Sequence, residues 1–272
     1  MAITFFGVSS TPTDNGSSAS PITITPPASM VKGDLVVVVL HHKSASAWSI
    51  VQGGGQTWTN IGVGTYVSVI SRAIYWCRYN GTWSANPSFS NAAGGTAPAT
   101  GIMTVFRPTL GSNTWAGYEV SNSGANATTA LVTLGSFTPS NSNSVSLGTW
   151  LSSDDNTWGT LTGTGWSKTG LAAQYRNLSG QDNSTALAYY IQGTVGVIPA
   201  VSQTQLTLGA DNTFGRTFNF YEIASSPGIL KRWNGSAWVK AKLKNYNGST
   251  FEQKKLKRWD GATWIEVDIT GV

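Results

Sequence analysis

The sequence predicts an all-β protein: a β-sandwich or jelly-roll body followed by a small C-terminal β-hairpin repeat module. Three observations lead to this fold class. Only 16 of residues 1–227 are charged, whereas helix surfaces normally use many Glu, Lys, Arg and Leu side chains. Short aromatic and β-branched runs alternate there with clusters of Gly, Asn and Ser, which favours strands and turns. Residues 230–272 contain a repeat of fixed period.

Twelve segments of the body have the composition of short strands bounded by turns. They are residues 3–6, 21–25, 34–41, 58–61, 66–77, 101–106, 130–133, 144–151, 171–176, 185–192, 204–208 and 216–223. So many short strands favour a sandwich or jelly roll. Residues 36–40 are continuously apolar, which predicts an inner strand buried on both faces.

The body also contains a weak internal echo. Two similar series of segments follow one another along the chain. The first consists of residues 33–36, two tryptophans, residues 73–76 and residues 102–106, and the second consists of residues 144–147, two tryptophans, residues 188–191 and residues 217–221. The tryptophans are Trp48 and Trp58 in the first series and Trp158 and Trp166 in the second. The echo predicts two related halves, each contributing about half of the strands.

The repeat consists of three 13-residue units, residues 230–242, 243–255 and 256–268, with the pattern L-K-[RN]-[WY]-[ND]-G-x-x-[WF]. Asn-Gly and Asp-Gly pairs accept the positive φ angles of a tight turn, so each unit predicts a β-hairpin. A lone short hairpin is marginal in water and needs a second surface. We predict an assembly interface formed by Trp233, Trp238, Tyr246, Phe251, Trp259 and Trp264. A mini-sheet packed entirely within the module is the alternative.

The predicted organisation is a body at residues 1–224, a linker at 225–229 and the repeat module at 230–272. The linker is expected because Pro227 and Gly228 end the last strand among small polar residues. The longest strongly apolar run, residues 35–40, is far shorter than a membrane-spanning helix, and the N-terminus does not resemble a secretory signal. We therefore expect no membrane insertion. Cys77, the single cysteine, predicts a small core residue.

The net charge of +5 is located in the tail. Residues 1–227 contain 8 basic and 8 acidic residues, whereas residues 228–272 contain 9 and 4. Basic residues among aromatic ones are compatible with binding to nucleic acid, to an acidic protein or to a glycan. Solvated lysines that prevent edge-to-edge strand pairing are the favoured explanation, and we expect no nucleic-acid partner.

Two segments resemble a known class of protein. The series that begins at residue 33, with Thr57-Trp58-Thr59 and Ala73-Ile74-Tyr75-Trp76, resembles β-sandwich domains of tailed-bacteriophage virion proteins over most of residues 20–223. Arg232-Trp233-Asn234-Gly235-Ser236-Ala237-Trp238 is similar to the W-N-G-x-x-W repeats near the ends of many phage tail and minor structural proteins. This resemblance implies a virion component of the tail, a fibre or the capsid surface, and it implies no catalytic residues.

Catalytic and metal-binding patterns are scarce. Asp154, Asp155 and Asp182 lie in turn-rich stretches, which favours turn chemistry, but calcium is the expected ligand if loops bring the three together. His41 and His42 are adjacent on a predicted strand and should face opposite sides, which disfavours a shared metal. No G-x-S-x-G elbow or phosphate loop is present in the sequence. We expect no enzyme activity, no cofactor and no metal.

Trp158 and Trp166, near Asn156 and the aspartates, are the candidate glycan contacts of the body, with core packing as the alternative. The function predicted from the sequence is a non-enzymatic structural component on the exterior of a tailed-phage virion, made in the host cytoplasm. Its expected partners are other virion subunits and further copies of itself, with a trimer as the symmetric guess. The alternative function is a carbohydrate- or host-receptor-binding module.

Overall fold

The computed structural model describes most of the body and the strands of the tail. The described residues are 3–9, 13–14, 21–43, 47–66, 70–91, 99–109, 113–120, 125–127, 129–175, 182–206, 211–224, 231–233, 236, 238–240, 244–246, 249, 251–253, 256–259 and 263–267. Within these ranges every regular element is a strand. The same residues contain no helix of the length and hydropathy needed to cross a membrane.

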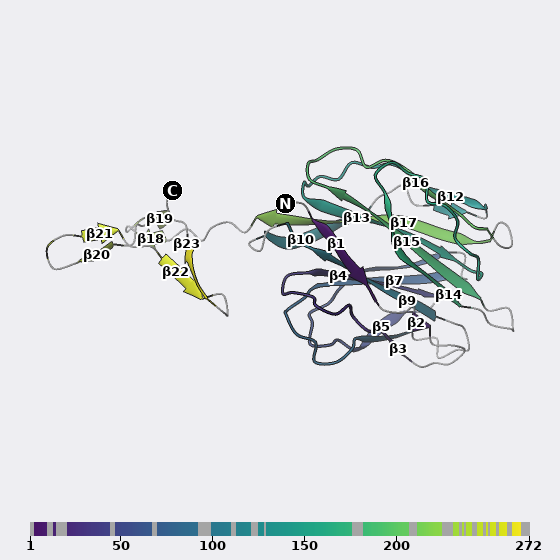
Figure 1. Ribbon diagram of the computed structural model, residues 1–272, viewed down its shortest axis with the longest axis horizontal. Helices are drawn as coiled ribbons and strands as arrows, with labels where there is room; N and C mark the ends of the chain where they lie inside the picture. The colour runs from purple at the N-terminus through teal and green to yellow at the C-terminus, as the bar shows by residue number, and fades with distance from the viewer. Residues whose placement is uncertain are drawn as a thin grey trace. The chain divides into compact units, whose positions relative to one another are not determined.

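Residues 1–223 form one compact unit and residues 224–272 form another. At the centre of the first unit two six-stranded sheets pack face to face, and a smaller sheet covers the outer face of each (Figure 1). The all-β sandwich is therefore confirmed. The jelly-roll connectivity stays a prediction.

The first large sheet, sheet A, has the strand order β1-β9-β4-β7-β6, with β2 beside β9. These strands are β1 Thr4–Val8, β2 Thr13–Asp14, β4 Leu35–His42, β6 Thr59–Tyr66, β7 Ile70–Arg78 and β9 Ala99–Arg107. The small sheet on its outer face has the order β3-β8-β5. Its strands are β3 Ile22–Thr23, β8 Ser88–Asn91 and β5 Trp48–Gln52.

The second large sheet, sheet B, has the order β10-β17-β13-β15-β14, with β11 beside β17. These strands are β10 Asn113–Val120, β11 Ala125–Ala127, β13 Ser144–Ser152, β14 Ser167–Tyr175, β15 Asn183–Gln192 and β17 Thr213–Ala224. Its outer layer is the pair β12 Leu131–Leu134 and β16 Val201–Thr204. Isolated bridges from Trp158 to Gln205 and from Thr162 to Ser202 place a further segment beside this pair.

Sheets A and B are built in the same way. Each strand of sheet A has a counterpart at the same place in the strand order of sheet B. The counterparts of β1, β4, β6, β7 and β9 are, in the same sequence, β10, β13, β14, β15 and β17. The outer layers also correspond. On sheet A, β8 lies between β3 and β5, and on sheet B, β16 lies between β12 and the segment at Trp158. The two related halves expected from the sequence are thus present as two copies of one strand order.

The contact between the two halves is reciprocal. Trp76 of β7 packs edge-on against Phe220 of β17, with ring centroids 6.0 Å apart. Tyr189 of β15, the counterpart of β7, packs edge-on against Phe106 of β9, the counterpart of β17, at 5.6 Å. Equivalent strands therefore use equivalent positions on each other, as subunits do across a twofold interface.

The central strand β4 is buried on both faces, as its apolar run predicted. Leu35, Val37 and Val39 belong to the core between the two large sheets. Val36, Val38 and Leu40 belong to a second core under the outer sheet β3-β8-β5. A third core lies between sheet B and β12-β16 and is built around Trp150 and Trp158. Alternation along the strands thus divides the apolar side chains among three interfaces.

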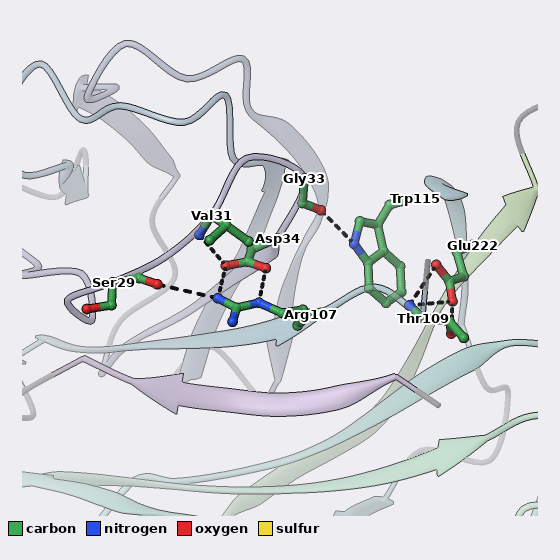
Figure 2. Close-up of polar contacts among 8 residues, drawn as sticks. All are labelled: Ser29, Val31, Gly33, Asp34, Arg107, Thr109, Trp115 and Glu222. Carbon is green, nitrogen blue, oxygen red and sulfur yellow. Dashed lines mark hydrogen bonds and ion pairs between the residues drawn. The ribbon is translucent and has the colours of Figure 1, made fainter. Parts of the chain in front are cut away.

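A polar network surrounds the turn that precedes β4, at one end of sheet A (Figure 2). The Asp34 carboxylate is fully buried and accepts two hydrogen bonds from Arg107, Nε to Oδ1 at 3.0 Å and Nη2 to Oδ2 at 3.1 Å. The backbone N–H of Val31 donates to the same carboxylate at 2.8 Å. The Trp115 indole N–H donates to the carbonyl of Gly33, whose φ of +100° is favoured for glycine. These bonds fix the turn that precedes β4 and attach β10 of sheet B to it.

A second carboxylate holds the connection between the halves. Glu222, buried near the end of β17, accepts hydrogen bonds from the backbone N–H and the hydroxyl of Thr109 (Figure 2). Thr109 lies just after β9, where the chain passes from sheet A towards sheet B. The last strand of the body is therefore tied to the start of the crossover.

The tail contains three antiparallel pairs, which are β18 with β19, β20 with β21 and β22 with β23. The strands are β18 Lys231–Trp233, β19 Trp238–Lys240, β20 Lys244–Tyr246, β21 Phe251–Gln253, β22 Leu256–Trp259 and β23 Trp264–Val267. Each pair falls within one 13-residue unit. The Asn-Gly and Asp-Gly turn residues, and the predicted linker, lie outside the described residues.

The sequence was wrong about some strand boundaries. Residues 66–77 were expected to form one strand, but β6 ends at Tyr66 and β7 begins at Ile70. The expected strand at residues 204–208 lies earlier, as β16 Val201–Thr204. Strands β2, β5, β8, β10 and β11 were not expected at all. Most of these are short or rich in polar residues, and they lie at sheet edges or in the outer layer, where local sequence preference is weak.

Candidate functional site

Three aspartates from two loops meet at one end of sheet B. Asp154 and Asp155 follow β13, and Asp182 precedes β15. One carboxylate oxygen from each residue lies within 4.8 Å of the others, and Asp155 is buried whereas Asp154 and Asp182 are half-buried. The loops thus bring together the three residues that the sequence predicted to bind calcium only if they lay close to one another. Because Ca²⁺ takes six to eight oxygen ligands, three carboxylates supply part of such a shell. The sequence predicted no metal unless these loops met, so calcium binding stays a conditional prediction.

Buried amide side chains support the loop beneath these carboxylates. The Asn156 amide donates to Gln205 Oε1 at 2.7 Å and to Asp211 Oδ2 at 2.6 Å. The Ser152 hydroxyl donates to the same Gln205 oxygen at 2.8 Å. In turn Gln205 Nε2 donates to the carbonyl of Thr129 at 3.1 Å. A fourth carboxylate, that of Asp211, is therefore held at the edge of the cluster.

The cluster is electrostatically unfavourable for Asp154. Partial burial is the main factor that raises the pKa of its carboxyl, and repulsion from Asp211, Asp155 and Asp182 raises it further. The backbone N–H of Asp155, which donates to Asp154 Oδ1 at 2.8 Å, opposes the increase in pKa. The folded state therefore resists ionisation of this group more than the unfolded state does.

We expect Asp154→Asn to stabilise the protein at neutral pH in the presence of a chelator. Because the folded pKa of Asp154 is raised, its contribution to stability decreases as pH rises from the unfolded pKa through the folded one, and the substitution removes this loss. The gain should be at most about 1 kcal/mol, as for other half-exposed charge pairs. Thermal unfolding at pH 4 and pH 7.5 measures it, with a gain expected only at the higher pH. Equal effects at both pH values would contradict the electrostatic explanation.

Trp158 and Trp166 are core residues. They are 7% and 8% exposed and belong to the cluster between sheet B and its outer layer. The Trp158 indole N–H donates to Ser184 Oγ at 3.1 Å, and that of Trp166 donates to the carbonyl of Pro199 at 2.9 Å. Trp166 also packs against Tyr190 with ring centroids 5.7 Å apart. Because sugar stacking needs an open ring face, this burial contradicts their proposed role as glycan contacts and agrees with core packing.

The adjacent histidines face opposite sides of sheet A, as strand alternation requires. His41 faces sheet B, where its Nδ1 lies 3.3 Å from Thr185 Oγ1. His42 faces the outer layer and contacts Trp48 edge-on at 6.2 Å. Burial lowers the pKa of His41 to about 3, so its imidazole is neutral at physiological pH. The two rings therefore lie on different surfaces and do not meet at one site.

The six aromatic residues of the tail form three directly opposed backbone pairs. Trp233 lies opposite Trp238, Tyr246 opposite Phe251 and Trp259 opposite Trp264. In each pair one residue ends the first strand and the other begins the second strand, and the turn expected between them stays a prediction. The side chains of these residues lie outside the described part of the structure, so their role at an interface stays a prediction.

Sequence reasoning missed the buried polar residues between and around the sheets. Asp34 and Glu222 were assigned to strands without a role, although both carboxylates bind across the fold. Arg72, buried on the inner face of sheet A, was also missed. The sequence offered one signal for these residues, which is a charged residue within a predicted strand. Charged residues are scarce in this body, so each one in a strand could have been marked as a candidate buried contact.

No protein-family model, no curated protein and no solved structure matches the chain.

Proposed function

We propose that this chain is a non-enzymatic structural component on the exterior of a tailed-phage virion, where the tail repeats dock onto other virion subunits or onto further copies of the chain. The resemblance of residues 232–238 to the W-N-G-x-x-W repeats of phage proteins, and of the body to virion β-sandwich domains, supports the proposal. The observation on which it depends most is the division into a sandwich with its own cores and a separate unit of three short strand pairs.

The physical argument concerns the strand pairs. Each has arms of only three or four residues, and each is a two-stranded sheet. Such a pair is at most marginally stable alone, and additional strands or a packing surface are needed for stability. A repeat of fixed length offers the same surface three times, which suits a partner with several equivalent positions. Docking of the repeats therefore supplies the missing packing surface.

The alternative, a carbohydrate- or receptor-binding module, loses its candidate residues in the body because Trp158 and Trp166 are buried. The aromatic residues of the tail are the candidate ligand contacts left for this alternative.

We expect deletion of residues 228–272 to leave the body folded but to abolish its incorporation into particles. The body should keep its structure because the described residues of its three cores all lie at or before Phe220. Circular dichroism and thermal unfolding of residues 1–227 measure folding, and quantitative blotting of purified particles measures occupancy. Normal occupancy of the truncated chain would reject the proposal.

A matched pair of full-length variants separates loss of docking from loss of the tail as a whole. Trp233→Ser, Tyr246→Ser and Trp259→Ser together should reduce occupancy at least tenfold. Ser236→Ala, Ser249→Ala and Thr263→Ala, each between the turn glycine and the second aromatic residue of its unit, should retain it. Equal occupancy of the two variants would show that the aromatic positions do not form the interface.

A further inference from the structure

A buried arginine lies at the contact between the two halves. Arg72 of β7 is 5% exposed and stands directly opposite His41 on the face of sheet A that meets sheet B. Its Nε and Nη1 atoms are buried and have no hydrogen-bond acceptor among the described residues. A buried N–H group without an acceptor costs about 1 to 3 kcal/mol, and more when the group is charged. The site therefore needs a further group to accept these bonds.

The other half supplies aromatic rings and a second cation. The Arg72 guanidinium carbon lies 4.2 Å from the ring centroid of Phe214 and 4.9 Å from that of Phe218, both on β17. The Arg216 guanidinium carbon lies 5.9 Å from the same Phe214 ring, and its buried Nε has no acceptor in the described part of the chain. Two guanidinium groups therefore approach one ring, with three N–H donor atoms unused.

Arg72 is charged at neutral pH. Burial, and secondly repulsion from Arg216, lower the pKa of its guanidinium to about 9, which leaves it protonated at pH 7. The rings of Phe214 and Phe218 provide cation–π attraction but accept no conventional hydrogen bond. The arrangement therefore has two positive charges and a shortage of acceptors.

The carboxylates with described partners are used elsewhere. Asp34 pairs with Arg107, and Glu222 accepts from Thr109. Asp34 lies seven residues from His41, the strand partner of Arg72, and Glu222 lies six residues from Arg216, which are separations of about 20 Å or more along the strands. Asp211 accepts from Asn156 in the acidic cluster. Among the described residues, no ion pair joins a carboxylate to Arg72 or Arg216.

We infer that a single small anion of the size of chloride binds between Arg72 and Arg216 and joins the two halves of the body. An anion accepts hydrogen bonds from the unused N–H groups and also compensates the charge, whereas water would only accept the bonds. Aromatic side chains on one side of the site restrict its size. The site uses one arginine from each half, so occupation stabilises the contact between them.

Anomalous diffraction locates the ion without any variant. Crystals of the full chain grown in sodium bromide should show a bromide peak within about 3.5 Å of Arg72 Nε or Nη1, in contact with Arg216. A water molecule or no density at this position, with bromide elsewhere on the surface, would overturn the inference.

Solution stability provides an independent test. At constant ionic strength maintained with sodium gluconate, replacing gluconate by chloride should raise the unfolding temperature of the full chain by several degrees and reach saturation. Arg72→Met should abolish the chloride dependence, whether or not the variant is itself more stable, and the surface control Lys32→Met should preserve it. The same chloride response in Arg72→Met, or none in the unmodified chain, would exclude the site.

Discussion

Replacing Trp150 by alanine should cost about 3 to 5 kcal/mol and lower the unfolding temperature by about 10 °C or more. Trp150 is completely buried in the core between sheet B and its outer layer. Its indole covers two glycines, Gly148 on the same strand and Gly215 directly opposite on β17. The indole N–H donates to the carbonyl of Val132 at 3.1 Å. Truncation would leave a cavity lined by backbone, which cannot close easily.

Graded variants separate the two contributions of this side chain. Trp150→Phe keeps most of the apolar contact but leaves the Val132 carbonyl without its donor, and it should cost about 1 to 2 kcal/mol. Val197→Ala, at a position that is 65% exposed, should change stability by less than about 0.5 kcal/mol. Urea unfolding measures all three variants. A loss below about 1 kcal/mol for Trp150→Ala would show that the outer layer contributes little to the fold.

Replacing Asp34 by alanine should cost about 2 to 4 kcal/mol. The carboxylate is inaccessible to solvent and accepts from Arg107 through two nitrogen atoms and from the backbone of Val31. Its loss removes the acceptor of a backbone N–H in the turn before β4. Arg107 is partly exposed and can turn towards water, which keeps the loss below that of a fully buried pair.

A double-mutant cycle tests whether the pair acts as a unit. Asp34→Ala and Arg107→Ala together should be less destabilising than the sum of the single changes, by at least about 1 kcal/mol, because each single change already breaks the shared interaction. Arg107→Lys keeps the charge but loses the paired geometry, so its cost should be intermediate. Additive single and double effects would show that Asp34 acts only through the turn.

The fold class and the central strands were predictable because they depend on local pattern. Residues 36–40 are apolar without interruption, and such a run fits a strand covered on both faces. By contrast, β8 has the sequence Ser-Phe-Ser-Asn, which resembles a loop, and it becomes a strand because β3 and β5 pair with it on either side. The break between β6 and β7 was missed because residues 67–69, Val-Ser-Val, contain one weak turn residue between two β-branched residues, which favour a continuous strand.

Side-chain sites were harder to predict because they depend on contacts between distant segments. The sequence placed Asp154 and Asp155 in a loop, but their proximity to Asp182 depends on the pairing of β13 with β15. A tryptophan beside polar residues is compatible with a sugar site or with a core, and only the position of the outer layer decided for the core at Trp158 and Trp166. Arg72 could not be assigned because the residues around it come from β17, far along the chain.

The reciprocal packing of Trp76 on Phe220 and of Tyr189 on Phe106 determines whether the two halves separate when the protein is diluted. Two separate subunits joined in this way would dissociate at low concentration, whereas here a covalent connection keeps the local concentration of each half around the other constant. The body therefore stays assembled however few copies are present, and the surface through which a single half would dimerise is already occupied.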